Sequence, residues 1–432
     1  MRMGTGKSAD HVPKSMIGRV GVALVATMLV LAACGEDGGG GGGTTDNLKL
    51  YNDKGAWEEF FREVGELSQE EIGLSMEPVG YTDEPTYEAF IMASFRTNVK
   101  PDLFTWSTGH RLNEIVREGV IAETTDLWTE AIANGDLTES LKPYYTIDGK
   151  QYCVPLNTAY WVMFYNKQIF DELGLQPPST WEDLISIADT LVENGITPFY
   201  HTAVLFSFVW FQQLMVGSDP ALYNALSEGT ASYTDPGVVA VMEEWKQMID
   251  KGYFSDPGDE TDPAAQLKSG KVAMGAWGTW FNTSMTQQEM TPGEDYGMFF
   301  IPNRVPQNNQ TAVLFESGPL CMLEDAPYRD ESMRYLEWWV TPSAQELWSN
   351  SRGDVSGNPK VEIADPGLNE ITQAAGTDDY VLYNRYFEAT PAPVLTAALD
   401  AFGAFVVNPD EYHSLLETIQ QANEDYWAGA DG

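Results

Sequence analysis

The side chains of this sequence that could do chemistry are aromatic rings and planar polar groups. The chain contains 13 Trp, 20 Tyr and 19 Phe. Aromatic residues at that density form hydrophobic cores first of all, but they also offer flat faces to a ligand. The four histidines and three cysteines are widely spaced, and no HExxH, CxxC, calcium-loop or G-x-S-x-G pattern occurs. We therefore expect a binding site without a cofactor or a metal ion, and no enzyme activity.

The elements that would position such side chains alternate between strands and helices. Residues 48–51 form a short apolar strand followed by the turn 52–55, and residues 101–106 form a second buried strand. Residues 57–67 and 111–119 carry apolar residues at helical spacing. Alternation of this kind predicts an α/β fold.

The clearest predicted helix covers residues 181–193. Ser179 and Glu182 have the spacing of a capping box, and Pro177–Pro178 prevents an earlier start. Asn194–Gly195 ends the helix, because these residues tolerate a left-handed conformation.

The length and charge of the chain narrow its class. A chain of 432 residues is too long for one ordinary hydrophobic core and predicts two or three domains or lobes. With 24 basic and 64 acidic residues, the formal net charge is −40. Because phosphate binding needs clustered Lys and Arg, this charge argues against nucleic acid as a partner and against a polybasic membrane anchor.

The N-terminus has the pattern of an export signal. Basic residues come first, and a 14-residue apolar stretch follows from Val20 to Ala33. That stretch is too short to span a membrane comfortably, so we expect residues 1–33 to be a signal peptide. The run Leu31-Ala32-Ala33-Cys34 resembles the lipobox of bacterial lipoproteins, which implies lipidation of Cys34; the alternative is a plain signal peptide with a chance cysteine. The Gly-rich residues 34–47 would be a flexible linker, holding the protein at the outer face of the cytoplasmic membrane through its lipid only.

Several sequence blocks occur in a specific order over nearly all of the remaining chain. Each block is weak alone, and the order makes the set informative. The central blocks are Tyr152-x-x-Pro155, Tyr165-Asn166-Lys167, Pro178-x-Thr180-Trp181-Glu182-x-Leu184 and Gly270-Lys271-x-Ala273-Met274, with Pro101–Trp106 before them and Tyr296–Pro302 after them. Together they resemble the extracellular solute-binding proteins of ABC importers, specifically the maltose-binding-protein-like sugar-binding lipoproteins.

The resemblance implies a periplasmic-binding-protein-like (type II) fold, in which two α/β lobes are joined by three crossovers. Lobe 1 would hold residues 48–156 and 317–362, and lobe 2 would hold residues 157–316 and 363–432. The ligand would lie between the lobes, which would close on it about a hinge. The resemblance further implies a monomer that captures a mono- or oligosaccharide and delivers it to the permease subunits of an ABC transporter.

The same resemblance selects candidate ligand-binding residues. A sugar stacks its C–H faces on aromatic rings, and its hydroxyl groups bond to planar polar side chains. Trp106 and Trp280 match stacking positions of the family, and Asn52 and Asp53 follow the first strand, where family members contact sugar. For each candidate, the alternative is a place in the core or in solvent. The candidates are Asn52, Asp53, Trp57, Trp106, His110, Arg111, Asn157, Trp161, Trp210, Trp277, Trp280, Glu316 and Tyr386.

Two cysteines remain beside Cys34. By the family layout, Cys153 and Cys321 both fall in lobe 1, on strands that could be neighbours. An exported protein permits a disulfide there. Two buried free thiols are the other interpretation, and the sequence leaves both open.

Other functions also remain open at this point. The same fold could bind a non-sugar solute such as a polyamine, a peptide or glycerol phosphate, or could serve as a surface adhesin or sensor. An exported carbohydrate-active enzyme would also need an aromatic cleft and two carboxylates. The acidic composition guarantees carboxylate pairs by chance, so they do not favour the enzyme.

Overall fold

The computed structural model describes residues 44–430, apart from residues 205 and 307–309. The expected signal peptide, Cys34 and most of the expected linker lie outside these described residues. Among the helices of the described part, none has both the length and the apolar character needed to cross a membrane.

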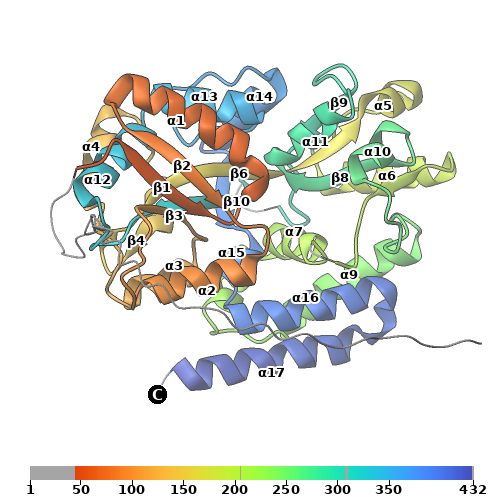
Figure 1. Cartoon of the computed structure of the whole chain (residues 1–432). Coiled ribbons are helices and arrows are strands. Elements are labelled where there is room, and N and C mark those ends of the chain that lie inside the picture. Colours follow the sequence, from red (N-terminus) through yellow and green to blue (C-terminus); the bar gives the residue numbers. More distant parts are fainter. Residues whose placement is uncertain (1–43, 205, 307–309, 431–432) are drawn as a thin grey trace, which may run out of the picture. The chain divides into compact units, whose positions relative to one another are not determined.

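Two β-sheets organise the described part of the chain (Figure 1). The strands are β1 (Asn47–Asn52), β2 (Ser75–Gly80), β3 (Leu103–Thr105), β4 (Thr146–Ile147), β5 (Lys150–Gln151), β6 (Val154–Asn166), β7 (Thr197–Phe199), β8 (Val272–Gly278), β9 (Tyr296–Phe299), β10 (Thr311–Cys321) and β11 (Tyr380–Asn384). The large sheet follows the path β2-β1-β3-β10-β6-β8-β7, with β11 on β10 and β9 on β6, whereas β4 and β5 pair separately. β1 is parallel to β2 and β3, and β7 is parallel to β8, while β6 is antiparallel to β8, β9 and β10.

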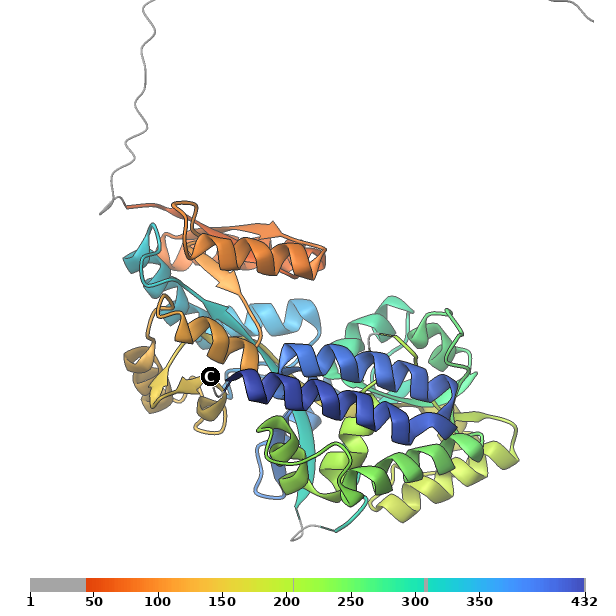
Figure 2. The ribbon, with the colours of Figure 1, turned by 90° about the horizontal axis from the view of Figure 1, so that it is seen from below.

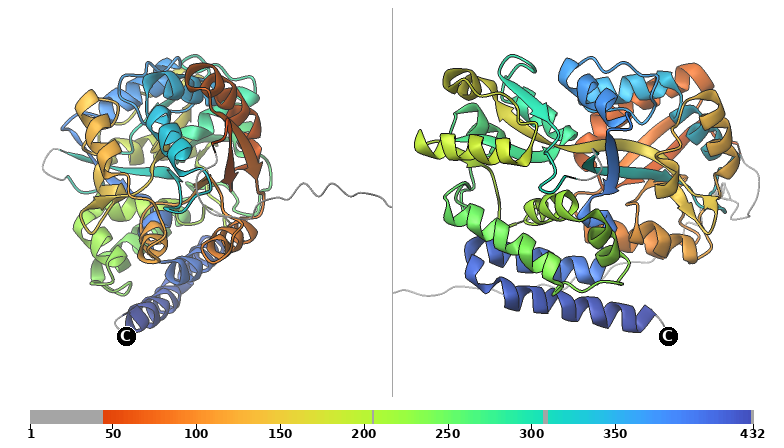
Figure 3. Two further views of the ribbon diagram at one scale, coloured as in Figure 1. Left: turned by 60° about the vertical axis from the view of Figure 1, so that its left-hand side comes forward. Right: turned by 180° about the vertical axis from the view of Figure 1, so that it is seen from behind.

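Helices flank the large sheet, and the last two long helices lie side by side (Figures 1, 2 and 3). The α-helices are α1 (Glu58–Ile72), α2 (Glu84–Ser94), α3 (His110–Arg117), α4 (Thr125–Asn134), α5 (Lys167–Leu173), α6 (Trp181–Glu193), α7 (Val209–Ser218), α8 (Pro220–Ser227), α9 (Pro236–Asp250), α10 (Pro263–Lys268), α11 (Asn282–Gln287), α12 (Arg329–Trp339), α13 (Pro342–Arg352), α14 (Pro366–Ala375), α15 (Tyr386–Ala389), α16 (Ala392–Val407) and α17 (Tyr412–Ala430). Short 3-10 helices are η1 (Gly55–Trp57), η2 (Lys142–Tyr145), η3 (Thr279–Phe281) and η4 (Pro409–Glu411).

Two large hydrophobic clusters divide this body into two lobes. The lobe 1 cluster contains buried side chains of β1, α1, α3, α4, α12 and α13. The lobe 2 cluster contains buried side chains of α6, α7, α9, α16 and α17. A further cluster around Phe164, Trp277 and Tyr296 belongs to β6, β8 and β9. A chain of this length exceeds what one hydrophobic core usually supports, so it forms separate hydrophobic clusters.

The chain passes between the lobes three times. β6 starts in the lobe 1 cluster at Val154 and reaches the lobe 2 cluster at Trp161. β10 returns in the opposite direction, from Leu314 in lobe 2 to Leu320 in lobe 1. The third passage is the segment between α13 and α14. The predicted two-lobe α/β fold with three crossovers is therefore confirmed.

The N-terminus of α6 differs from the predicted capping box by one residue. Thr180, not Ser179, is the N-cap: its hydroxyl oxygen accepts from the Asp183 amide at 3.1 Å. The Asp183 carboxylate accepts in return from the Thr180 amide at 3.0 Å and from the Ser179 hydroxyl at 2.9 Å. The pairs Ser179/Glu182 and Thr180/Asp183 both have the spacing of a capping box in the sequence. In the structure, the side chain of Asp183, which is shorter than that of Glu182, reaches the preceding amides.

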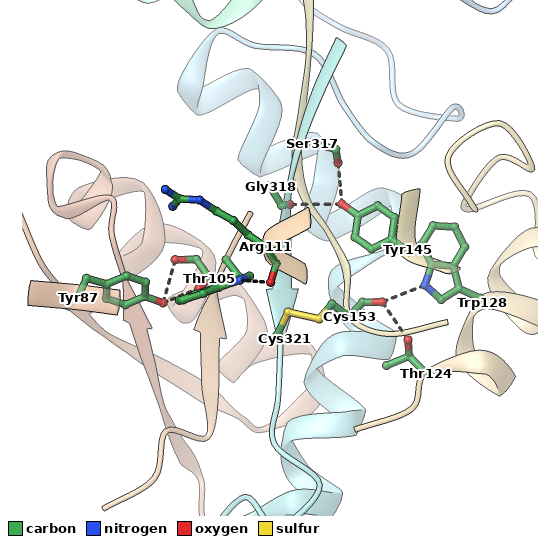
Figure 4. Close-up of a disulfide and its surroundings, with 11 residues drawn as sticks. Tyr87, Thr105, Arg111, Thr124, Trp128, Tyr145, Cys153, Ser317, Gly318 and Cys321 are labelled. Carbon is green, nitrogen blue, oxygen red and sulfur yellow. Dashed lines mark hydrogen bonds between the residues drawn. A yellow bond between two sulfur atoms is a disulfide. The ribbon is translucent and has the colours of Figure 1, made fainter. Parts of the chain in front are cut away.

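Cys153 and Cys321 form a disulfide within lobe 1 (Figure 4). Their Cα atoms are 4.4 Å apart, and both residues are buried. Cys153 has a left-handed backbone, with φ of 61°. Its carbonyl oxygen accepts hydrogen bonds of 2.9 Å from the Thr124 hydroxyl and the Trp128 indole, which fix this conformation. The bond ties β10 to the residue before β6 and decides between the two interpretations that the sequence left open.

Removing this cross-link should destabilise the protein. The double variant Cys153→Ala/Cys321→Ala should lose roughly 2–5 kcal/mol of unfolding free energy, because its unfolded chain is less constrained. Chemical unfolding followed by circular dichroism measures the loss. A reductant should lower the Tm of the wild type and leave that of the double variant unchanged. Alkylation of Cys153 or Cys321 in unreduced wild-type protein would contradict the disulfide.

Candidate functional site

A cavity of about 320 Å³ lies where the two lobes meet. This volume is within the range of small-molecule sites. Its lining comes from both lobes and from the two strands that join them. The lining residues are Asp53, Lys54, Trp57, Thr82, Trp106, Ser107, Asn157, Phe206, Phe208, Trp280, Glu316, Ser317, Gly318, Arg385, Phe387 and Glu388.

The carboxyl ends of parallel strands position much of this lining. In lobe 1, Asp53 follows β1, Thr82 comes shortly after β2, and Trp106 follows β3. In lobe 2, Phe206 comes after β7 and Trp280 comes after β8. Parallel strands present their carboxyl ends at one edge of a sheet, so the loops that leave them converge there. The cavity is therefore built from the corresponding edges of both lobes.

Trp280 forms the centre of an aromatic wall on the lobe 2 side. Its ring centroid is 5.7 Å from that of Phe206 and 6.2 Å from that of Trp161. Trp161 is buried and pairs with Gly278 at the end of β8, so it supports the wall from behind. The Trp280 indole donates a hydrogen bond to Glu316, which fixes the plane of its ring. Trp280 remains partly exposed and can offer a face to a ligand.

Trp57 is the corresponding ring on the lobe 1 side. The Arg352 guanidinium lies 3.6 Å from the centroid of its ring, and the Lys54 ammonium lies 5.0 Å from it. Arg352 is itself buried, and its charge is balanced by Asp354 at 3.6 Å. These cation–π contacts hold the Trp57 ring in one orientation beside the cavity.

Asp53 provides a charged acceptor at the edge of the cavity. Burial alone would raise its pKa. The Lys54 charge at 3.0 Å and the Thr105 hydroxyl at 2.6 Å outweigh burial, so the pKa of Asp53 lies below its ordinary value of 3.8. Asp53 is therefore a carboxylate at neutral pH and can accept from a ligand hydroxyl.

Arg385 connects two buried carboxylates in the wall of the cavity. Its Nε donates to Glu388 at 2.8 Å, and its guanidinium also forms an ion pair with Glu316. Glu316 and Glu388 are only 7% and 5% exposed. Burial raises the pKa of Glu316, and the Arg385 charge offsets only part of that effect. Since buried charges need partners, Arg385 maintains this wall in addition to lining the cavity.

The structure brings six of the thirteen candidates to the cavity. Asn157 is one of them, and it is 7% exposed, with a side-chain oxygen that has no hydrogen-bond partner in the described structure. That oxygen is a buried acceptor without a partner beside the cavity. The six are Asp53, Trp57, Trp106, Asn157, Trp280 and Glu316.

Four aromatic candidates are packed in the hydrophobic clusters and do not line the cavity. They are Trp161, which lies behind the aromatic wall, Trp210, Trp277 and Tyr386. The Trp210 indole donates to the Tyr200 carbonyl oxygen at 3.2 Å. Trp277 stacks on Phe281 with a centroid distance of 4.0 Å. Tyr386 is 2% exposed, and its hydroxyl hydrogen-bonds to that of Tyr233 at 2.7 Å. Burial on all sides keeps these rings out of the cavity.

The last three candidates make contacts outside the cavity. The side-chain oxygen of Asn52 accepts from the Lys54 amide at 3.0 Å, so Asn52 shapes the turn that presents Asp53. Arg111 forms an ion pair with Glu88. His110 bonds to a lobe 2 carbonyl group, as described below.

Sequence reasoning missed all three lining residues from the C-terminal part of lobe 2. Arg385 directly follows β11, and Phe387 and Glu388 lie in α15. β11 pairs with β10 in the register Phe315↔Asn384, which brings this segment to the cavity. No motif marks the segment, so only the non-local strand pairing places it. For Phe206 and Phe208, the aromatic run after β7 was the available signal.

This lining suits reversible binding of a small polar molecule, because it combines aromatic faces with fixed hydrogen-bonding groups. Residues 66–375 match the family described as bacterial extracellular solute-binding protein. The chain belongs to this family. The matched stretch runs from the second half of α1 to the end of α14, so it includes lining residues from both lobes of the solute-binding protein.

Relatives of this solute-binding protein are distant in sequence. An uncharacterised ABC transporter extracellular-binding protein of Pyrococcus horikoshii is 28% identical over 217 residues, which is 47% of each chain. The alpha-glucosides-binding periplasmic protein of Rhizobium meliloti is 21% identical over 345 residues, covering 72% of this chain and 73% of the relative. The match thus spans about half the length of the Pyrococcus protein.

A solved structure supports the fold assignment over a longer stretch. A chitin oligosaccharide binding protein superposes with a TM-score of 0.73 at 19% identity, covering 88% of this chain and 98% of that chain. The likeness extends over both lobes. It confirms that this solute-binding protein has the two-lobe fold.

Replacing Arg385 with methionine should destabilise this solute-binding protein. The variant leaves Glu316 and Glu388 buried without their shared cation, and breaking a buried pair costs about 3–5 kcal/mol. Urea unfolding measures the loss, and adding Glu316→Gln should recover part of it. The control is Arg62→Met, which breaks an exposed pair with Glu58 and should cost less than about 1 kcal/mol. Equal losses in the two single variants would contradict this account of the wall.

Proposed function

We propose that this protein captures a mono- or oligosaccharide in the cavity between its lobes. The observation that carries the proposal is the pairing of partly exposed rings from opposite lobes, Trp57 and Trp280, with the fixed polar groups of Asp53 and Arg385. Sugar C–H faces stack on such rings, and hydroxyl groups bond to such polar groups. In a closed cavity, each unmatched hydroxyl costs about 1–3 kcal/mol, which provides selectivity.

The charges of the cavity argue against an anionic ligand. Asp53 is paired with Lys54, and Arg385 is shared by Glu316 and Glu388. A glycerol phosphate would need a free cation, whereas three carboxylates and two cations give the lining a formal charge of −1, so the choice of a sugar over a polyamine rests on the aromatic rings. The names of two similar proteins, one for alpha-glucosides and one for chitin oligosaccharides, agree with this choice.

The captured sugar would pass to the permease subunits of an ABC transporter. The Pyrococcus relative carries the name of an ABC transporter extracellular-binding protein. A ligand that contacts both lobes stabilises their closed arrangement through its differential affinity for that state. A permease that recognises the closed lobes would therefore select the loaded protein. Each chain contains the whole cavity, so a monomer suffices, and binding requires no catalysis.

We propose further that the protein is held at the outer face of the cytoplasmic membrane by a lipid on Cys34. The support is the sequence alone: a basic start, a short apolar stretch, the run Leu31-Ala32-Ala33-Cys34 and a Gly-rich linker. The linker would let the two-lobe body reach a permease beside the anchor.

Cys34→Ala should release the protein from the membrane. Without the thiol, no acyl chain can be attached, and the described residues hold no membrane-spanning helix to replace it. Metabolic labelling with an alkyne fatty acid and membrane fractionation measure the two effects. The control Cys153→Ala/Cys321→Ala should keep the label. If the wild-type protein takes up no fatty-acid label, lipidation is wrong and Cys34 is a chance cysteine after a plain signal peptide.

Trp280→Ala should weaken sugar binding by roughly 1–3 kcal/mol without unfolding the protein. A saccharide panel screened by thermal shift first selects the ligand, and calorimetry then measures the affinities. Trp280→Phe keeps a ring but loses the bond to Glu316, so it should lose less. The control Tyr412→Ala removes a ring outside the cavity and should bind like the wild type. Unchanged affinity of Trp280→Ala would remove Trp280 from the site.

The same panel tests the proposed function as a whole. Analysis of each saccharide after incubation reveals whether it has been hydrolysed. Binding without turnover agrees with capture, whereas turnover would make the protein an enzyme. A thermal shift with polyamines or glycerol phosphate, and none with any sugar, would contradict sugar capture and identify a non-sugar solute as the ligand.

A further inference from the structure

The two lobes contact each other directly at the start of α3. α3 belongs to lobe 1, since its buried residues lie in that cluster, and α15 belongs to lobe 2. Gly109, the N-cap of α3, has φ of 68°, and a Cβ atom there would lie 2.0 Å from the Glu388 carbonyl oxygen on α15. Only glycine allows this approach. We refer to this arrangement, in which the lobes touch, as the closed arrangement.

His110, the next residue, bonds to lobe 2 on its own. Its Nε2 lies 2.9 Å from the Ser227 carbonyl oxygen at the end of α8. A carbonyl oxygen only accepts, so Nε2 carries a proton and donates it. The His110 ring also meets Trp427 of α17 edge-on, with centroids 5.9 Å apart. Trp427 can take this place only because residue 229 is glycine. A Cβ atom at Gly229 would lie 2.2 Å from the Trp427 indole and would exclude it.

We propose that His110 is a latch between the lobes, whose neutral imidazole bonds to lobe 2 in the closed arrangement, so that acidification opens the lobes. The loss of a bound sugar that would accompany opening rests on the proposed function, whereas the opening of the lobes itself does not. Three observations carry the proposal: the cross-lobe bond, the partly buried position of the ring between the lobes and the close approach at Gly109 beside it.

Closure should oppose protonation of His110. Burial lowers its pKa from the ordinary 6.5, the Arg117 charge lowers it further, and the bond to Ser227 opposes both. The other charged groups at the cavity beside it are Glu228, next to Ser227, and Glu388, which is paired with Arg385; α17 presents the neutral Trp427 there. These two carboxylates would favour the cation, yet the net direction of the pKa is downward.

The sign of the pH effect follows from linkage. When the lobes separate, His110 regains water and its ordinary pKa near 6.5. Above that pH both arrangements are neutral at His110, and the latch is fully effective. As the pH falls through 6.5, the open arrangement binds a proton that the closed one resists. The closed-to-open ratio then falls by up to about tenfold per pH unit, until the pH reaches the lower pKa of the closed arrangement.

The other two described histidines cannot give this effect. His201 lies inside lobe 2, stacked on Phe254, and burial lowers its pKa to about 4. His413 is exposed on α17. Neither side chain lies at the contact between α3 and lobe 2.

Small-angle X-ray scattering of the ligand-free full chain at pH 8 and pH 5 tests the latch. All proteins carry Cys34→Ala, so that none carries a lipid. We expect the radius of gyration of this parent to rise on acidification. His110→Gln keeps a side-chain amide that can donate to Ser227 but cannot titrate, so its radius should stay constant. The control His413→Gln should follow the parent.

Gly109→Ala serves as the open reference. Its methyl group excludes the close approach to Glu388, so its radius of gyration should exceed that of the parent at pH 8. Circular dichroism at both pH values confirms that each variant is folded. A parent without a pH response, or a His110→Gln variant that responds as the parent does, would overturn the latch. Because no sugar is added, that result would leave sugar capture intact, whereas failure of the saccharide panel would leave the latch intact.

Discussion

The antiparallel pairing of β6 with β10 is the interaction on which both lobes and the cavity depend. Its register runs from Phe315↔Tyr160 to Leu320↔Val154, across the junction of the two hydrophobic clusters. Backbone hydrogen bonds join the two strands on both sides of an irregularity between Gly318 and Pro319, and they hold the connection in the plane of the sheet. The middle of the pair carries Asn157 and Glu316, which line the cavity. The element that joins the lobes therefore also positions the centre of the site.

Burial of charge is the second constraint on this region. Glu316, Glu388, Arg352 and Asp354 are all at most 7% exposed. Each would be costly alone, and each has an opposite charge beside it. These pairs fix the indole of Trp280 through Glu316 and the ring of Trp57 through Arg352. The rings that can face a ligand thus owe their orientation to ion pairs behind them.

The fold was largely predictable from the sequence, and the site only in part. Helical periodicity and motif order are local or nearly local, and they predicted α6 and the two-lobe α/β fold. Trp277 and Trp280 show where local reasoning ends. Both were candidates for ligand binding, but Trp277 lies on β8 and faces a core, whereas the chain leaves the strand at Gly278 and turns Trp280 toward the cavity. Arg385 was missed because only the pairing of β11 with β10 brings it to the site, and no pattern near Arg385 encodes that partner.

The free energy of closure of the two lobes has two contributions. A ligand between Trp57 and Trp280 would supply the larger part, because only a closed cavity brings both rings to it. The direct contacts of Gly109 and His110 with lobe 2 supply a part that is independent of ligand. That part must stay small, since a strong contact would close the empty protein and hide the difference between loaded and unloaded states. A single hydrogen bond is worth only about 0.5–1.5 kcal/mol, enough to bias the equilibrium and too little to decide it. One histidine at this contact therefore fits a protein whose closure has to report on its ligand.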